Sequence, residues 1–169
     1  MTSPSVFLTA PVTGRLFPIS KSSDETFSQE ILGGGFLLYP DLDSNQNPDT
    51  VYQIVLAPIA GQVVSLFPHA VAISGTGDYE GVDLLVHLGV ETVKLKGEGF
   101  ELLAEVGQEL KQNDPWVIWD QHTIVSAGYS TEVLVVLLPS LESSRLAEVI
   151  SSGLAIRPVK AGQRLFRIS

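Results

Sequence analysis

Leu56-Ala57-Pro58-Ile59-Ala60-Gly61 follows the same pattern as Thr9-Ala10-Pro11-Val12-Thr13-Gly14. In both stretches Ala-Pro-x-x-Gly leads directly into an apolar run that is long enough for one strand. A weaker echo relates segment 105–115 to segment 159–165, and both contain Gly-Gln. Such turns are typical of barrel-sandwich folds in which half-barrels repeat. The echo therefore favours a compact β barrel or sandwich over an α/β fold.

Short apolar runs, bounded by Gly, Pro, Asp or Asn, recur along the rest of the chain. Runs rich in Val, Ile and Leu with such boundaries are typical of strands. Many short strands at close spacing predict an all-β fold, a single antiparallel sandwich or barrel domain over residues 1–169. The expected strands are Val6–Thr9, Gly14–Pro18, Gly35–Tyr39, Val51–Leu56, Gly61–Ser65, Ala70–Ser74, Asp83–His87, Trp116–Trp119, Glu132–Leu137, Leu154–Pro158 and Gln163–Ile168.

One or two short helices complete the expected elements. Ser140–Ser151 has apolar residues at helical spacing, with Ser140 placed to cap its start and Gly153 to end it. A further helical turn is expected at Glu101–Gly107. The Asp-, Asn- and Pro-containing stretch Pro40–Thr50 reads as an exposed loop, because strand-like sequence resumes immediately after it.

Composition excludes several classes of function. The 169 residues include no cysteine, which excludes disulfides, thiolate metal sites and cysteine nucleophiles. The formal net charge of −9 argues against nucleic acid as a partner, because that binding needs clustered Lys and Arg. The longest apolar runs, such as Val133–Pro139, are far shorter than the ~20 residues of a membrane span. With no targeting signal at the start, we expect a cytoplasmic protein without direct membrane insertion.

Three histidines are the candidates for chemistry. His87 closes the apolar strand Val82–His87, on the face opposite to Leu84 and Val86. His69 lies on a turn between two expected strands, so the two side chains can converge in the fold. Imidazole suits phosphoryl transfer, because its pKa of about 6.5 leaves the neutral nucleophile well populated at neutral pH. His122 reads as a solvated loop residue, and we assign it no role.

The stretch that follows His87 is more specific than a lone histidine. His87–Phe100 reads His-Leu-Gly-Val-Glu-Thr-Val-Lys-Leu-Lys-Gly-Glu-Gly-Phe. It resembles the active-site signature of the glucose-type enzyme IIA family of the bacterial phosphoenolpyruvate-dependent sugar phosphotransferase system. Ala10–Gly14, Phe27–Gly35, Ala57–Ala70 and Ser152–Ile168 resemble further segments of that family, so the similarity covers nearly the whole chain.

The resemblance implies a function and a mechanism. The fold would be a β sandwich or barrel of the duplicated hybrid motif type. His87 would accept a phosphoryl group from the phosphohistidine of the carrier HPr and pass it to a sugar-specific enzyme IIB. His69 would hydrogen-bond that group. No cofactor or metal ion would be required, and the protein would be a monomer. The residues expected to contact the partners are Phe27, Phe67, Leu85, Glu91 and Val93.

The chain departs from the family pattern at several positions. Glu91 stands where the family usually has Asp. Pro68 alone separates Phe67 from His69, where the family usually has a longer segment that contains a supporting Thr. An Asp- and Asn-rich insertion lies near Asp41–Asp49. These differences predict a divergent member, whose partners can differ from the familiar glucose ones.

The alternative that remains open is a regulatory or scaffolding module. Such a protein would use the same histidine to bind target proteins according to phosphorylation state, without feeding a transporter. A zinc peptidase of the lysostaphin type needs His-x-x-x-Asp and His-x-His, and Ile73 and Leu85 stand where these patterns need Asp and His. The two histidines could share an adventitious zinc ion with a partner's carboxylate. A catalytic zinc ion typically needs three protein ligands, and the sequence does not supply that set.

Overall fold

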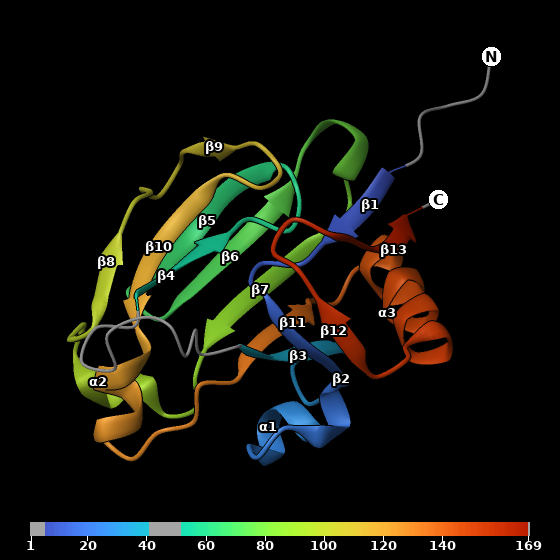
Figure 1. Ribbon diagram of the computed structural model, residues 1–169. Coiled ribbons are helices and arrows are strands. Elements are labelled where there is room, and N and C mark those ends of the chain that lie inside the picture. The colour runs from blue at the N-terminus through green and yellow to red at the C-terminus, as the bar shows by residue number, and fades with distance from the viewer. Residues whose placement is uncertain (1–5, 41–51, 169) are drawn as a thin grey trace.

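Antiparallel strands are the main elements of the computed structural model, which describes residues 6–40 and 52–168. The largest sheet has eight strands in the order β12-β2-β3-β11-β7-β6-β5-β9. A second sheet has the order β4-β10-β8, and a third pairs β1 with β13 (Figure 1). Within the described ranges no pairing joins the two end strands of the large sheet, so the arrangement is a sandwich and not a closed barrel.

The elements follow one another closely along the chain. The strands are β1 (Val6–Thr9), β2 (Gly14–Pro18), β3 (Gly35–Pro40), β4 (Tyr52–Leu56), β5 (Gly61–Phe67), β6 (Ala70–Gly75), β7 (Asp83–Leu88), β8 (Phe100–Leu102), β9 (Glu109–Leu110), β10 (Pro115–Asp120), β11 (Val133–Leu137), β12 (Arg157–Val159) and β13 (Arg164–Ile168). The α-helices are α1 (Glu25–Ser28), α2 (Gln121–Ser126) and α3 (Leu141–Gly153). The 3₁₀ turns are η1 (Ile19–Lys21), η2 (Gly77–Tyr79) and η3 (Thr92–Leu95).

The all-β prediction is confirmed, with small differences in the elements. Each expected strand is present with bounds shifted by at most a few residues. The helical turn expected at Glu101–Gly107 is wrong, because β8 and a turn occupy those residues. α1 and α2 were not expected, and they bring the α-helices in the described ranges to three. The loop expected at Pro40–Thr50 lies, from residue 41 on, outside the described residues. None of the described helices is long and apolar enough to cross a membrane.

The two Ala-Pro-x-x-Gly turns contact each other with matching hydrogen bonds. The N–H of Thr9 donates to the carbonyl of Pro58 (3.1 Å), and the N–H of Leu56 donates to the carbonyl of Pro11 (2.9 Å). Thr9 and Leu56 hold equivalent places in the two repeats, as do Pro11 and Pro58. The two copies of the repeat are therefore joined by main-chain hydrogen bonds.

The second echo makes matching bonds to the same two turns. The main-chain N–H and carbonyl of Ala57 bond to Asn113–Asp114, both at 2.8 Å. Those of Ala10 bond to Gly162–Gln163, at 2.9 and 2.8 Å. Each turn is thus hydrogen-bonded to a loop of its own, which gives partners to the main-chain groups of the buried residues Ala10 and Ala57.

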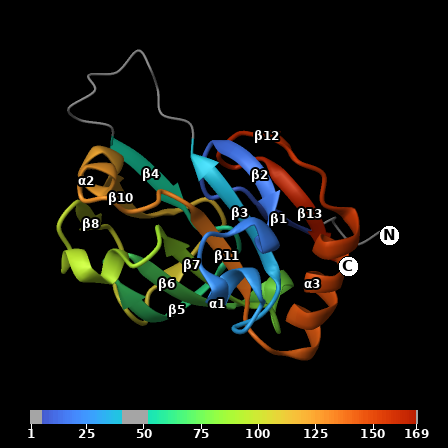
Figure 2. The ribbon, with the colours of Figure 1, turned by 90° about the horizontal axis from the view of Figure 1, so that it is seen from below.

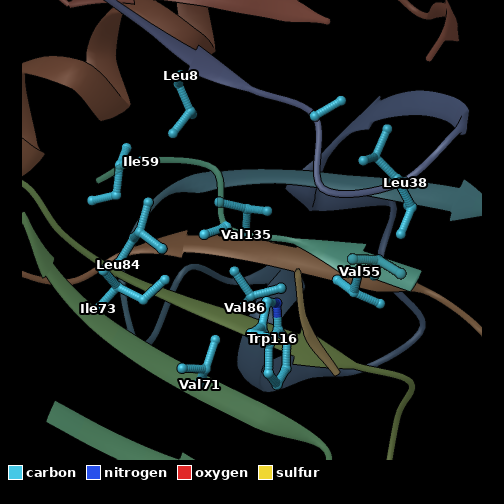
Figure 3. Packing of buried hydrophobic residues seen from close by; sticks show 14 of the residues in the cluster. Leu8, Leu38, Val55, Ile59, Val71, Ile73, Leu84, Val86, Trp116 and Val135 are labelled. Atoms are coloured by element: carbon cyan, nitrogen blue, oxygen red, sulfur yellow. The ribbon is translucent and has the colours of Figure 1, made fainter. Parts of the chain in front are cut away.

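The main hydrophobic core fills the space between the sheets. Figure 3 shows Val71, Ile73, Leu84, Val86 and Val135 of the large sheet meeting other buried side chains. Their partners include Leu8, Leu38, Val55, Ile59 and Trp116, none of which is measurably exposed. Burying each such side chain contributes ~1.5–3 kcal/mol to folding.

A smaller hydrophobic cluster lies on the other face of the large sheet. Leu37 of β3 and Leu134 and Val136 of β11 pack there against Ile19 and Phe27. These last two residues belong to η1 and α1, the segment that lies over β11 in Figure 2. The η1–α1 segment is therefore fixed to the sheet by apolar contacts, and it covers the end of β7 that carries His87.

Helix α3 begins and packs largely as expected. The Ser140 hydroxyl accepts a hydrogen bond from the N–H of Ser143 (3.0 Å) and donates one to the Gly81 carbonyl (2.8 Å). Leu146 is buried, whereas Val149, expected on the same face, is 45% exposed. The helix includes Gly153 as its last residue.

Candidate active site

His87 owes its position to the alternation of β7. Leu84, Val86 and Leu88 point into the main core, which places Leu85 and His87 on the opposite face. The pairing of β7 with β11 sets His87 opposite Leu134. The predicted division of the strand into two faces is confirmed.

His69 reaches the same place through a tight hairpin. β5 and β6 pair up to Phe67 and Ala70, so Pro68 and His69 alone form the loop. Ala70 pairs with His87 across β6 and β7, and the N–H of Leu88 donates to the His69 carbonyl (2.8 Å). The two imidazole rings consequently lie edge to face, with centroids 5.1 Å apart and planes inclined at 77°. The short Phe67-Pro68-His69 connection therefore still brings the two histidines together.

One hydrogen bond sets the tautomer of His87. Its Nδ1 lies 2.8 Å from the carbonyl oxygen of Gly89, and because a carbonyl only accepts, Nδ1 carries the proton. In the neutral ring the lone pair is therefore on Nε2. Gly89 has a φ of +76°, and a Cβ there would lie 2.4 Å from Cγ2 of Thr92. A residue without a side chain is thus needed for the loop to turn its carbonyl toward the ring.

Both histidines are held in the neutral form. Burial is the main reason that the pKa of His87 falls from 6.5 to about 4, and the neighbouring His69 lowers it further. The Gly89 carbonyl and the Asp24 carboxylate oppose this shift in the pKa of His87. Burial also lowers the pKa of His69. At neutral pH the site therefore presents an uncharged nucleophilic nitrogen beside a second neutral imidazole.

An aromatic side chain covers one side of His87. The ring of Phe27 lies 5.1 Å from that of His87, centroid to centroid, at an angle of 55°. Phe27 is only 5% exposed, so in this conformation it packs on the histidine and offers little surface to a partner. It is carried by α1, whose first turn is capped by Asp24 through the N–H of Thr26 (2.8 Å).

The other expected contact residues differ in exposure. Phe67 and Val93 are 56% and 61% exposed, which leaves two apolar side chains accessible. Glu91 is exposed and forms an ion pair with Lys94 (3.4 Å). Leu85 is partly buried against the smaller hydrophobic cluster. The structure thus leaves Phe67, Glu91 and Val93 available to a partner, while Leu85 and Phe27 lie beneath.

Sequence reasoning missed three features of the site. Neither the Gly89 carbonyl nor the cap at Asp24 was singled out, and Glu132 was read only as the first residue of a strand. A lone acid before an apolar run gives no signal that its carboxylate accepts hydrogen bonds from the distant hydroxyls of Ser22 and Ser23. His122 is exposed, as expected, but lies on α2 and not in a loop. Among the described residues, no cluster of three His, Asp or Glu could hold a metal ion.

The comparisons with known proteins agree with this geometry. The family model described as phosphoenolpyruvate-dependent sugar phosphotransferase system, EIIA 1, matches residues 6–142. Among solved structures, glucose permease IIA from Mycoplasma capricolum is 25% identical, with a TM-score of 0.80. That likeness covers 99% of this chain and 97% of the other. The chain belongs to the EIIA 1 family of the phosphoenolpyruvate-dependent sugar phosphotransferase system, and it is a phosphocarrier component of that system.

Proposed function

We propose that Nε2 of His87 accepts a phosphoryl group from phospho-HPr and donates it to a cysteine of a sugar-specific enzyme IIB. The observation that carries the proposal is the bond from Nδ1 to the Gly89 carbonyl, which leaves the Nε2 lone pair free beside His69. A neutral imidazole with one nitrogen fixed by a hydrogen bond is suited to nucleophilic attack.

The transfer balances without any other reactant. The Nε2 lone pair of His87 forms a new N–P bond while the N–P bond of the donor's phosphohistidine breaks, and the departing imidazole keeps that electron pair. Nδ1 of His87 keeps its proton, so the phosphorylated ring carries a positive charge that the Gly89 carbonyl stabilises. Because the phosphoryl group is the cargo, the proposal requires no cofactor and no metal ion.

His69 is proposed to hold the transferred group. Its ring lies edge to face with that of His87, close enough for a ring N–H to donate to a phosphoryl oxygen once the group is in place. Because burial lowers the pKa of His69, the ring is neutral before transfer. The incoming negative charge favours protonation of His69, which strengthens that hydrogen bond.

HPr and enzyme IIB are proposed to dock in turn on one surface around the histidines. Phe67 and Val93 supply exposed apolar area there, and Glu91 supplies a negative charge. The net charge of −9 favours encounter with a basic carrier. We propose that this exchange takes place in the cytoplasm. A docked partner also excludes water, which strengthens the interactions that hold the phosphoryl group.

The test is phosphorylation in a mixture of phosphoenolpyruvate, enzyme I and HPr, followed by intact mass. The wild-type chain should gain one phosphoryl group. His87→Gln should gain none, whereas His69→Gln should still accept the group but fail to pass it to enzyme IIB. His122→Gln is the matched control and should behave as wild type, because His122 lies on the exposed side of α2. A phosphorylated His87→Gln variant would refute the assignment.

A further inference from the structure

Glu132 is a buried carboxylate placed directly before β11. Its side chain is only 1% exposed. One oxygen, Oε1, accepts hydrogen bonds from the N–H and the hydroxyl of Ser23 (3.1 and 2.6 Å) and from the Tyr39 hydroxyl (3.2 Å). The other, Oε2, accepts from the Ser22 hydroxyl (2.8 Å). Four donors thus compensate the burial of one negative charge, for which the described residues provide no salt-bridge partner.

Three of the four donors belong to the segment that leads into α1, and the fourth, the Tyr39 hydroxyl, lies on β3. Ser22 and Ser23 connect η1 to Asp24, which caps α1. The Ser22 hydroxyl that donates to Glu132 also accepts from the N–H of Asp24 (3.1 Å). Phe27, whose ring covers His87, is the third residue after Asp24. The carboxylate therefore fixes the start of the helix that carries this aromatic cover.

The main chain of Glu132 reaches the other side of the histidine. Its carbonyl accepts a hydrogen bond from the N–H of Gly89 (2.6 Å). The carbonyl of Gly89 is the group that fixes the Nδ1 proton of His87. Glu132 also lies two residues before Leu134, which pairs with His87 across β11 and β7. One residue thus contacts both the loop that sets the tautomer and the segment that covers the ring.

We propose that Glu132 is a positioning residue for phosphoryl transfer at His87. It never touches the phosphoryl group. It holds Phe27 against one side of the imidazole of His87 and fixes the position of the loop at Gly89. Nε2 of His87 then points outward in one orientation. The inference rests on the proposed function for its consequence in catalysis, while its structural part concerns only the arrangement of Phe27, Gly89 and His87.

A carboxylate suits this role better than a neutral side chain. Hydrogen bonds to a charged acceptor are about twice as strong as neutral ones. Two oxygens can accept all four donors of Ser22, Ser23 and Tyr39 simultaneously. Removing the side chain takes away the one acceptor that these donors share, and the η1–α1 segment then loses its polar attachment to the sheet. The apolar contacts of Ile19 and Phe27 remain, which is why the variants are expected to fold.

The first measurement needs no phosphoryl donor. Nuclear magnetic resonance on the full chain, with labelled Phe and His, reports the ring-to-ring contact of Phe27 with His87 and the tautomer of His87. Glu132→Ala and the double variant Ser22→Ala, Ser23→Ala should both weaken the contact, and Glu132→Ala should also mix the two tautomers. Glu132→Gln, which keeps one acceptor oxygen and the side-chain volume, should restore most of both signals.

The second measurement follows the reaction. At saturating phospho-HPr, the transfer rate of Glu132→Ala should fall on the order of tenfold while KM changes little, because a small misplacement of a reacting group costs rate and not docking. Phosphorylation by phosphoramidate, a small donor that docks on no surface, should slow by a similar factor. Glu132→Gln should recover most of the rate in both assays.

Ser143→Ala is the matched control. The buried Ser143 hydroxyl also bonds main-chain groups of the large sheet, the N–H and carbonyl of Asp83, but at the opposite end of β7 from His87. It should lower stability without changing the Phe27 contact, the tautomer or the rate. Contact and tautomer in Glu132→Ala that match wild type would overturn the proposal, as would equal changes in Ser143→Ala. Lost contact in a chain whose wild type accepts no phosphoryl group would support the positioning role and refute the proposed function.

Discussion

His69 and His87 lie edge to face, with ring centroids 5.1 Å apart, although 17 residues of chain separate them. The contact follows from two pairings, the β5–β6 hairpin with its two-residue loop and the alignment of Ala70 with His87. Both imidazole rings are uncharged at neutral pH, because burial lowers both pKa values. The pair is therefore arranged to receive negative charge and not to present positive charge beforehand.

The first prediction concerns pH. The pKa of His87 is lowered from 6.5 to about 4, so the unfolded state binds its proton at a higher pH than the folded state does. The contribution of His87 to the free energy of unfolding is therefore fully present above pH 6.5. It is lost as the pH falls toward 4, and the loss is on the order of 3 kcal/mol at most. Chemical denaturation at a series of pH values should show this slope, which should be smaller in His87→Gln. Equal slopes in the two proteins would show that His87 does not cause it.

The second prediction concerns Asp24, whose carboxylate raises the pKa of His87. In Asp24→Asn the amide oxygen can still accept from the N–H of Thr26 and cap α1. The charge is lost, so the pKa of His87 should fall further, which a titration of the ring signals by nuclear magnetic resonance would detect. Asp24→Ala should lower it in the same direction and also cost ~1 kcal/mol of stability through the lost cap. An unchanged pKa in Asp24→Asn would contradict the electrostatic role.

The third prediction concerns Gly89. A Cβ at this position would lie 2.4 Å from Cγ2 of Thr92 and 2.7 Å from the carbonyl oxygen of Ser130, at a φ of +76°. Gly89→Ala should therefore destabilise the fold by ~2–4 kcal/mol, disturb the bond to Nδ1 of His87 and slow phosphorylation.

Gly128→Ala is the control for that experiment. Gly128 has a similar φ of +87°, but nothing lies within 4 Å of its Cβ position. The substitution should cost only ~1 kcal/mol and leave phosphorylation unchanged. Equal losses of stability in Gly89→Ala and Gly128→Ala would show that backbone strain alone, and not the crowded approach to Thr92, sets the cost.

Most of the fold could be predicted from sequence, because the strands carry their own local signals. The alternation of Leu84, Val86 and Leu88 with Leu85 and His87 gave both the strand and its two faces. β8 has only three residues and was missed because it overlaps the segment Glu101–Gly107, where a helical turn was expected. α1 and α2 were missed because helices of four and six residues are too short to show a period.

The site was predictable only in part. The histidine pair was identified through the resemblance of His87–Phe100 to a family signature, and the structure brings the two rings together. The role of Gly89 could not be predicted, because a glycine in a signature does not indicate that its own carbonyl accepts a hydrogen bond from the imidazole of His87. Glu132 was hidden for a similar reason. Its partners Ser22 and Ser23 lie about a hundred residues away, and no local pattern encodes such a contact.

The last prediction concerns docking on the exposed apolar side chains. Phe67 is 56% exposed at the end of β5, beside His69, with ring centroids 5.9 Å apart. Phe67→Ala should leave the melting temperature nearly unchanged but raise KM for phospho-HPr about tenfold, because an aromatic anchor contributes more than 1 kcal/mol to an interface. Val64→Ala is the control, since Val64 is 54% exposed on the same strand but three residues further from the histidines. A rise in KM of equal size in both variants would mean that general exposed hydrophobicity, and not a surface centred on the histidines, attracts the partner.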